Sequence, residues 1–232
     1  MLATLAPIAA RSRPLPPQVM PGTAPANVLE PLRAVAVTMR MDRDEEIVAQ
    51  GDPAGYCHLL VGGCARTVKL MEDGRRQVGE FLLAGDLFGW EALEEHDFGV
   101  EAVTDVTLLR YPRSAIEALA DRERDFARKL RMLTAGQIRA GRERVVLLGR
   151  KTAGERIASF LIEMAGRIRG GGTMIGLPMS RADMADYLGL TIETVCRGLT
   201  QLRTRGVIAV ERSKIVILDR RALGIASCET VH

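Results

Sequence analysis

The sequence predicts an α+β protein in which a β-roll, a long helix and a winged helix-turn-helix follow one another. Three observations predict this order. Short β runs broken by glycine-containing turns occupy residues 47–111, a pattern typical of an all-β barrel, roll or jelly roll. A proline-free amphipathic stretch then follows Pro112. The last part of the chain combines helical patterns, a Gly-Gly-Gly loop and a terminal hairpin pattern, which indicates a second, compact α+β unit.

The composition fits a folded protein with two domains. The chain has 232 residues, of which 47% are hydrophobic and 26% charged, and domains usually run to ~100–150 residues. No apolar run approaches the ~18–20 residues that a membrane helix needs, so we expect no membrane partner and a cytoplasmic protein. The cysteines show no CxxC pair and no Cys/His ligand spacing, so we expect reduced thiols and no metal. They are Cys57, Cys64, Cys196 and Cys228.

The pattern divides the chain into five segments. Residues 1–27 hold six of the ten prolines and show no helical or strand period, so we expect a disordered proline-rich arm. We expect the β-roll over 28–111 and the long helix over 112–148. The winged helix-turn-helix is expected over 149–222, and a flexible tail over 223–232.

The long helix has an apolar side that needs a partner. About 35 helical residues would span roughly 50 Å, which is too long to lie on a small β-roll. The protruding apolar stripe therefore predicts a homodimer in which two copies of the helix pack together. The alternative is two helices broken near Gly136 or Gly141. The residues expected at the dimer interface are Leu119, Phe126, Leu130, Leu133, Ile138 and Val145.

Residues 179–202 predict a helix-turn-helix. Ser180, with Asp183 three residues later, resembles a capping box at the start of a short helix. Gly189 allows the left-handed turn that ends this helix, and Thr191 can cap the next one. Two short helices joined at a glycine turn, followed by a hairpin wing, form a winged helix-turn-helix. The second helix buries Val195, Leu199 and Leu202, and the wing strands are expected over 207–210 and 215–218.

The polar face of the second helix predicts contact with DNA bases. Glu193 and Arg197 are four residues apart, so they point the same way from its N-terminal half. Arginine can donate two hydrogen bonds to guanine, and glutamate can accept one from cytosine; the alternative is a surface ion pair. The chain from residue 149 onward contains 13 Lys/Arg and 8 Asp/Glu. This excess of basic residues favours a polyanionic binding partner. The expected base contacts are Glu193, Cys196 and Arg197, and the expected phosphate contacts are Thr191, Thr194, Arg181, Arg203, Arg205, Arg212 and Lys214.

The order of parts over about residues 30–222 resembles the CRP/FNR superfamily of bacterial transcription regulators. The run 191–197 (TIETVCR) is similar to the family's recognition motif, and 85–89 (GDLFG) to its β-roll signature. The Glu–x–x–Cys–Arg variant is most similar to the FixK-type regulators of rhizobia. The resemblance implies a homodimer that binds palindromic double-stranded DNA with TTGA-type half-sites. It also implies an activator that recruits RNA polymerase to genes for microaerobic respiration and nitrogen fixation.

The resemblance also bears on cofactors. Relatives that bind cyclic nucleotides hold the phosphate with an Arg–Ser pair shortly after the glycine motif. Here His96 and Asp97 fall near that position within an acidic stretch, which opposes a phosphate. Oxygen-sensing relatives hold an iron–sulfur cluster on cysteines near the N-terminus, whereas this chain has no cysteine before Cys57. We therefore predict no cofactor; the alternative is a regulator gated by a small molecule or a haem-bound gas.

Cys196 is a candidate redox-sensitive residue. It lies in the first turns of the expected recognition helix, where the helix dipole and the adjacent guanidinium of Arg197 favour the thiolate. Oxidation would place charge or bulk against the DNA. The alternative is a small apolar contact with a thymine methyl group or within the helix packing. Cys57 and Cys64 lie in strand-like runs and are expected to be buried. The sequence contains no nucleophile elbow or phosphate-binding glycine loop, so we do not expect an enzyme.

Overall fold

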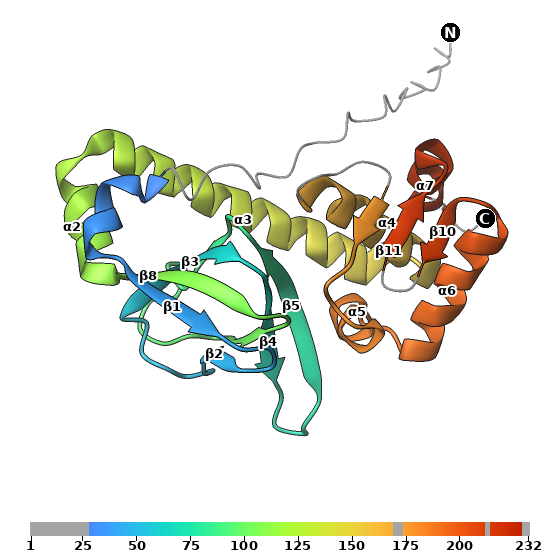
Figure 1. The fold of residues 1–232 in the computed structure, drawn as a ribbon, viewed down its shortest axis with the longest axis horizontal. Helices are drawn as coiled ribbons and strands as arrows, with labels where there is room; N and C mark the ends of the chain where they lie inside the picture. Colours follow the sequence, from blue (N-terminus) through green and yellow to red (C-terminus); the bar gives the residue numbers. More distant parts are fainter. Residues whose placement is uncertain (1–27, 169–173, 212–213, 229–232) are drawn as a thin grey trace, which may run out of the picture.

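The computed structural model describes residues 28–168, 174–211 and 214–228. A β-roll lies at one end, a smaller α+β domain lies at the other, and a long helix runs past both (Figure 1). This is the α+β architecture that the sequence predicts. The expected arm over 1–27 lies outside the described residues.

The β-roll consists of two antiparallel four-stranded sheets, preceded by a short 3-10 helix at Glu30–Val35. The sheet orders are β1-β8-β3-β6 and β2-β7-β4-β5. Apolar side chains fill the space between them, including Leu60 and Leu108 from the first sheet and Leu82 and Val100 from the second. The strands are β1 (Val37–Met41), β2 (Glu46–Val48), β3 (Tyr56–Gly62), β4 (Cys64–Leu70), β5 (Arg76–Leu83), β6 (Leu87–Phe88), β7 (Gly99–Ala102) and β8 (Val106–Pro112).

The glycine motif 85–89 brackets the short strand β6. Gly85 has φ 104° and Gly89 has φ 83°, which is a backbone region that side chains other than glycine rarely adopt. A Cβ atom at Gly89 would also lie 3.1 Å from both the His96 ring and the Tyr56 carbonyl oxygen. Both glycines are therefore required by the local backbone.

The expected single helix over 112–148 is wrong, because the structure contains two helices. They are α2 (Arg113–Arg122) and α3 (Arg124–Arg150), separated at Glu123, whose backbone is extended. The break therefore occurs at neither Gly136 nor Gly141. It lets Ile116 of α2 and Phe126 of α3 enter the same apolar cluster beside β3 and β8.

The second domain is built from α4, α5, α6 and a small sheet. Its elements are α4 (Ala153–Arg167), β9 (Met174–Gly176), α5 (Arg181–Leu188), α6 (Ile192–Thr204), β10 (Ile208–Glu211), β11 (Lys214–Ile217) and α7 (Arg220–Ala226). The wing strands β10 and β11 lie within one residue of the expected ranges, and β9 adds a third strand beside β11. The prediction of a flexible tail from residue 223 is wrong for its first part, because Leu223 and Ala226 of α7 are buried.

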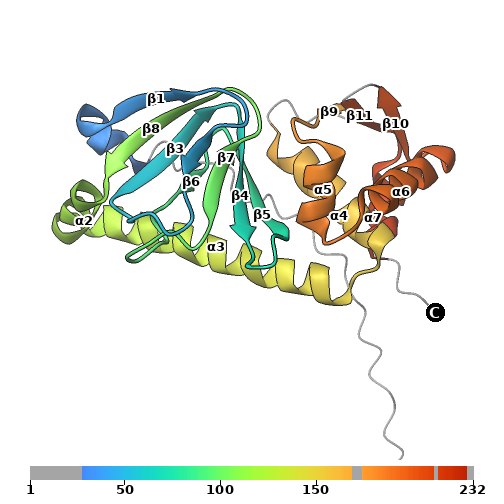
Figure 2. The ribbon, with the colours of Figure 1, turned by 90° about the horizontal axis from the view of Figure 1, so that it is seen from below.

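The two domains share one apolar core. Strand β5 lies on the side of the roll that faces the second domain (Figure 2). The Phe81 ring of β5 lies 5.1 Å from the ring of Tyr187 and 6.1 Å from that of Phe160, measured between ring centroids. These aromatic contacts fix the position of α5 against the roll.

Candidate nucleic-acid interface

Each predicted start and stop signal of the helix-turn-helix is present. The Ser180 hydroxyl accepts a hydrogen bond from the Asp183 backbone N–H at 3.1 Å, and the Asp183 carboxylate accepts one from the Ser180 N–H at 2.9 Å. Gly189 ends α5 in the left-handed conformation, with φ 60°. Thr191 caps α6 by accepting a bond from the Thr194 N–H at 3.2 Å. These local bonds set the start of each helix and the turn between them.

The packing of α6 decides which of its side chains face outward. Its apolar residues Val195, Leu199 and Leu202 are buried, as the sequence predicts. Gly198 lies against Ile157 of α4, since a Cβ atom at that position would come within 2.3 Å of the isoleucine Cδ1. The opposite face of α6 is therefore exposed to solvent.

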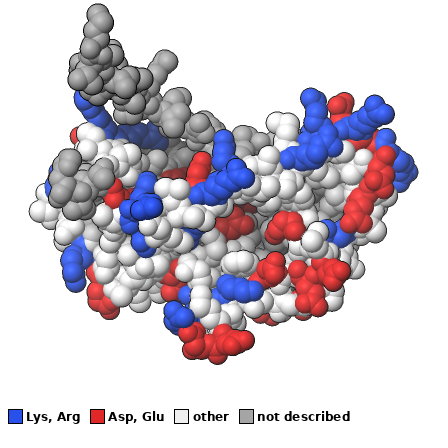
Figure 3. All heavy atoms as spheres, turned by 180° about the vertical axis from the view of Figure 1, so that it is seen from behind, with Lys and Arg blue, Asp and Glu red and all other residues white. Residues whose placement is uncertain are grey.

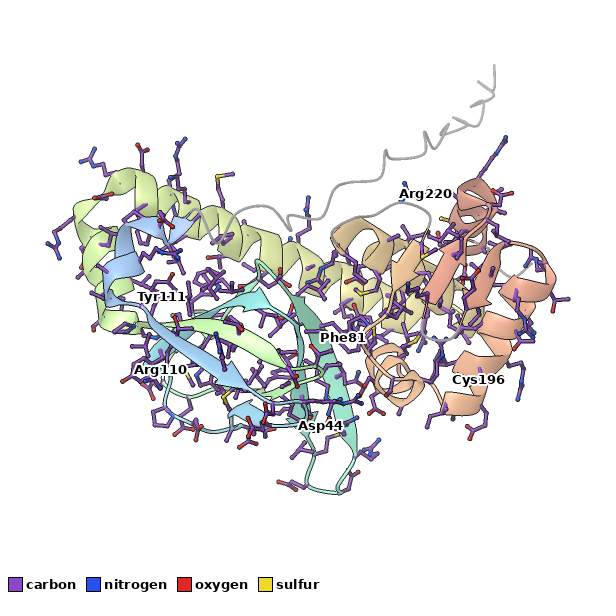
Figure 4. The ribbon with its side chains drawn as sticks, in the orientation of Figure 1. Asp44, Phe81, Arg110, Tyr111, Cys196 and Arg220 are labelled. Atoms are coloured by element: carbon purple, nitrogen blue, oxygen red, sulfur yellow. The ribbon has the colours of Figure 1, made fainter. Side chains whose placement is uncertain are left out.

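The structure brings the three expected base-contacting residues to this exposed face. Glu193, Cys196 and Arg197 are all exposed in the first half of α6. Cys196 lies at the end of the molecule away from the β-roll (Figure 4). The face continues as a shallow groove of about 530 Å³. The groove is lined by Cys196, Arg197, Thr200, Gln201, Thr204 and Arg205.

Three further residues, Thr200, Gln201 and Thr204, line this groove and were not among the predicted contacts. Thr200 and Gln201 follow Arg197 by three and four residues, and Thr204 lies one further turn along the same side of α6, so helical spacing alone could have found them. Their hydroxyl and amide groups can both donate and accept hydrogen bonds. They extend the polar face of α6 beyond its first turns.

Glu193 keeps a negative charge at the tip of the helix. Hydrogen bonds from its own backbone N–H and from the Thr191 hydroxyl lower the pKa of Glu193, and the charge of Arg197 acts in the same direction. The ionised carboxylate can only accept hydrogen bonds, whereas the guanidinium of Arg197 can only donate them. The exposed face of α6 therefore offers an acceptor and a donor, one helical turn apart.

The expected phosphate contacts are spread around α6 rather than gathered in one patch. Thr191 and Thr194 lie at its N-terminus, where their hydroxyl oxygens are 3.0 Å apart. Arg203 and Arg205 are exposed at its opposite end, and Lys214 is exposed at the start of β11. Arg212 lies outside the described residues. On the face shown in Figure 3, basic and acidic side chains are interspersed over both domains.

Arg181 differs from the other expected phosphate contacts because it is half-buried. Burial lowers the pKa of its guanidinium, which lies near Cys196. It also donates to the Met184 sulfur at 3.2 Å. Arg181 thus lies where α5 crosses α6.

Arg156 of α4 holds the turn of the motif, a role that was not predicted from the sequence. Its guanidinium donates to the carbonyl oxygens of Leu188 at 3.0 Å and Leu148 at 2.7 Å. It therefore joins the end of α5 to the end of α3. No local pattern reveals this role, because the bonds are made to backbone carbonyls of distant segments.

The expected dimer stripe divides into a covered half and an exposed half. Phe126 is 3% exposed and packs inside its own chain, so it presents almost no surface to a second copy. Leu119, Leu130 and Leu133 are partly buried against the same intramolecular cluster. Further along α3, Ile138 is 52% and Val145 is 71% exposed. Val146 is also exposed on this part of the helix, and Met132 is exposed beside Leu133.

The four cysteines fall into two classes. Cys57 and Cys64 are buried, as predicted, and burial raises the pKa of each thiol to about 12. Cys196 and Cys228 are exposed. Oxidants in solution reach exposed thiols more readily than buried ones, so Cys196 and Cys228 are the accessible pair.

The buried histidines of the roll do not resemble a metal site. His58 and His96 are both buried, and burial, with the charges of His96 and Arg110, lowers the pKa of His58 to about 4. Among the described residues, no group of three or more His, Cys, Asp or Glu side chains could hold a metal ion. Within the same residues, no helix combines the length and hydropathy needed to cross a membrane.

Comparisons with known proteins agree with this geometry. Residues 38–123 match the cyclic nucleotide-binding domain, and residues 155–224 match the Crp-like helix-turn-helix domain. The nitrogen fixation regulation protein FixK of Azorhizobium caulinodans is 43% identical over 204 residues, covering 86% of this chain and 81% of FixK. The chain belongs to the CRP/FNR family. Within that family it is FixK-like, and it is a DNA-binding transcription regulator, not an enzyme.

Two further relatives support the family assignment. The transcriptional activator protein FnrL of Cereibacter sphaeroides is 34% identical, with 81% of this chain and 86% of FnrL covered. The solved structure of FixK2 from Bradyrhizobium japonicum is 42% identical and superposes with a TM-score of 0.81. That superposition covers 85% of this chain and all of the FixK2 chain. The similarity to CRP/FNR proteins thus includes both domains.

Proposed function

We propose that this regulator binds, as a homodimer, a palindromic operator with TTGA-type half-sites. It activates genes for nitrogen fixation and microaerobic respiration by recruiting RNA polymerase, and it works in the cytoplasm without a small-molecule cofactor. The observation that carries the proposal is the exposed face of α6, where Glu193, Cys196 and Arg197 project together. The names of the FixK relatives support the link to nitrogen fixation.

The base-reading part follows from the chemistry of this face. The N-terminal half of a recognition helix reaches base edges in the major groove. Arg197 can donate two hydrogen bonds to guanine O6 and N7, and ionised Glu193 can accept one from cytosine N4. A TTGA half-site contains a G·C base pair, which offers both partners.

The homodimer follows from the exposed half of α3. Ile138 and Val145 are seven residues apart, as in a helical seam, and both are more than half exposed. Pairing two copies of α3 would bury this stripe. A two-fold dimer would also place its recognition helices about one DNA turn apart, ~34–36 Å.

A binding assay with a labelled palindromic duplex tests the operator, and sedimentation tests the dimer. We expect Ile138→Glu and Val145→Glu to give monomers that lose operator affinity. Leu93→Glu is the matched control, because Leu93 is 89% exposed in the β-roll and should leave the dimer intact. A monomeric wild type with full operator affinity would contradict the proposal. In-vitro transcription with purified RNA polymerase tests activation.

We propose that oxidation of Cys196 inactivates the protein. Its thiol is exposed on the face that we assign to DNA, so a sulfinic or sulfonic group would set negative charge against the bases. Peroxide should lower the operator affinity of wild type but not that of Cys196→Ser. Cys228→Ser is the matched control, and it should lose affinity as wild type does. Equal losses in wild type and Cys196→Ser would contradict the proposal.

The second candidate is a ligand-gated regulator of the same fold, favoured by the match of residues 38–123 to the cyclic nucleotide-binding domain. Against a cyclic nucleotide stands the acidic sequence near His96, where relatives carry an Arg–Ser pair. Titrating cyclic nucleotides during the operator-binding assay separates the two. We expect unchanged operator affinity, whereas a saturable increase would favour the gated regulator.

A further inference from the structure

A charged network joins the β-roll to the first helix of the helix-turn-helix. Arg66 of β4 donates from Nη1 to the Asp183 carboxylate of α5 at 2.6 Å. Arg76 of β5 donates from Nε and Nη2 to the Asp186 carboxylate at 3.0 and 2.7 Å. Its Nη2 also lies 3.3 Å from the Asp183 carboxylate. Glu101 of β7 accepts two further bonds from Arg66.

The central pair of this network is removed from water. The side chain of Arg66 is 11% exposed and that of Asp183 is 6% exposed. Charges in such a place are stable only when they are paired and hydrogen-bonded with good geometry. Moving α5 away from the roll would leave Asp183 without its partner. The network therefore favours one orientation of α5 over others.

Asp183 connects this network to the capping of α5. One carboxylate oxygen, Oδ2, accepts from the backbone N–H and the hydroxyl of Ser180 at 2.9 and 2.7 Å. The other oxygen, Oδ1, accepts from Arg66 and Arg76. Asp183 therefore both caps the start of α5 and bonds to the β-roll.

Further contacts around the network hold the same helix. Gln77 of β5 donates to the Asp186 carbonyl oxygen, and Arg144 of α3 donates to the Tyr187 carbonyl oxygen. The Arg144 guanidinium also lies 3.3 Å from the centroid of the Tyr187 ring. Both the roll and the long helix therefore fix α5, which packs directly against α6.

We infer that Arg66 and Arg76 of the β-roll are positioning residues for DNA recognition. They hold α5 through Asp183 and Asp186, and α5 in turn sets the direction in which α6 faces. Both arginines bond to α5 and do not line the exposed groove of α6 that we assign to DNA. The inference rests on the proposed function, because it assigns to the roll a role in operator binding by α6.

A double-mutant cycle on the full-length protein tests this inference. We expect Arg76→Ala to bind the selected palindromic operator about 10-fold more weakly, because part of the population has α6 misdirected. Asp186→Ala should cause a smaller loss of operator affinity. The double variant should stay within about 2-fold of Arg76→Ala, since both changes break the same contact. Arg76→Lys, which keeps the charge but not the paired bonds, should be intermediate.

Two readouts separate positioning from direct contact. The salt dependence of operator binding should be unchanged in Arg76→Ala, because no phosphate contact is lost. Amide hydrogen exchange should increase in β5 and α5 together and stay unchanged in the wing strands. Arg75→Ala is the matched control: Arg75 is the neighbouring residue, and its ion pair with Asp73 at 2.7 Å stays within the hairpin.

Equal operator affinities of Arg76→Ala and Arg75→Ala would overturn the inference. So would additive losses in the double variant, or a smaller salt dependence in Arg76→Ala. Failure of wild type to prefer any operator would overturn the proposed function and this inference with it. In that case the hydrogen-exchange comparison would still show whether Arg76 docks α5, so the two failures can be told apart.

Discussion

Gly198 is the point at which the recognition helix meets α4 most closely. A Cβ atom there would lie 2.3 Å from the Cδ1 of Ile157, whose side chain is 1% exposed. Alanine normally stabilises a helix by about 1 kcal/mol relative to glycine. Overpacking in a filled core costs ~1–3 kcal/mol. Gly198→Ala should therefore lower the free energy of unfolding by ~0–2 kcal/mol.

The effect of Gly198→Ala on the free energy of unfolding should change sign when the Cδ1 methyl group of Ile157 is removed. In the Ile157→Val variant Cδ1 is absent, and the next atom, Cγ1, is 3.7 Å from the added Cβ, an ordinary van der Waals distance. Gly198→Ala should then stabilise by up to ~1 kcal/mol. The coupling free energy between the two sites is therefore ~1–3 kcal/mol. Operator affinity should fall in Gly198→Ala and recover in the double variant.

Urea unfolding of the four proteins, at one fixed protomer concentration, measures this coupling. Gly166→Ala is the control, because Gly166 is exposed on α4 and a Cβ atom there meets nothing within 4 Å. It should stabilise slightly in both backgrounds and show no coupling to Ile157. A stabilising Gly198→Ala in the wild-type background, or zero coupling, would refute the packing of α6 on α4.

Two further predictions concern pH and salt. Burial raises the pKa of Glu80 from 4.5 to about 7, so the folded state favours the protonated carboxyl group. The contribution of this group to stability is therefore complete below about pH 4.5 and is lost as the pH rises through 7. The side chain of Glu80→Gln cannot ionise, so the free energy of unfolding of this variant should rise relative to that of wild type between pH 5 and pH 8. Thermal unfolding should show this difference growing by up to ~3 kcal/mol, at about 1.4 kcal/mol per pKa unit. A difference that is constant with pH would contradict the burial of the carboxylate. Lys214→Gln should weaken binding to all duplex sequences alike and reduce the salt slope by ~1. Glu211→Gln is the control, because Glu211 of β10 pairs with Lys214 of β11. A change of sequence preference in Lys214→Gln would contradict a phosphate contact.

Local signals made the helix-turn-helix predictable. The caps at Ser180 and Thr191 and the turn at Gly189 depend on residues within four positions of one another, so the sequence contains all the information they need. The buried face of α6 follows from helical periodicity in the same way. The burial of Cys57 and Cys64 follows from their place in apolar strand patterns.

Features that depend on distant residues could not be predicted. Helical periodicity places Phe126 on the apolar face of its helix. It does not show whether that face packs against the β-roll of the same chain or against a second copy of the helix. The break at Glu123 lets two helices fill one cluster, and no glycine or proline marks it. Arg66 and Asp183 are 117 positions apart, and Arg156 bonds to backbone carbonyls that carry no sequence signature. Long-range contacts of this kind appear only in the folded structure.

Selection of bound sequences from a random duplex library, under reducing conditions, tests base reading by α6 most directly. Wild type should enrich a palindrome of TTGA-type half-sites. Arg197→Ala should enrich the same palindrome with discrimination lost at one base pair in each half, at ~1–3 kcal/mol per half-site. An unchanged motif in Arg197→Ala, or no enriched motif for wild type, would contradict the assignment of this face to DNA.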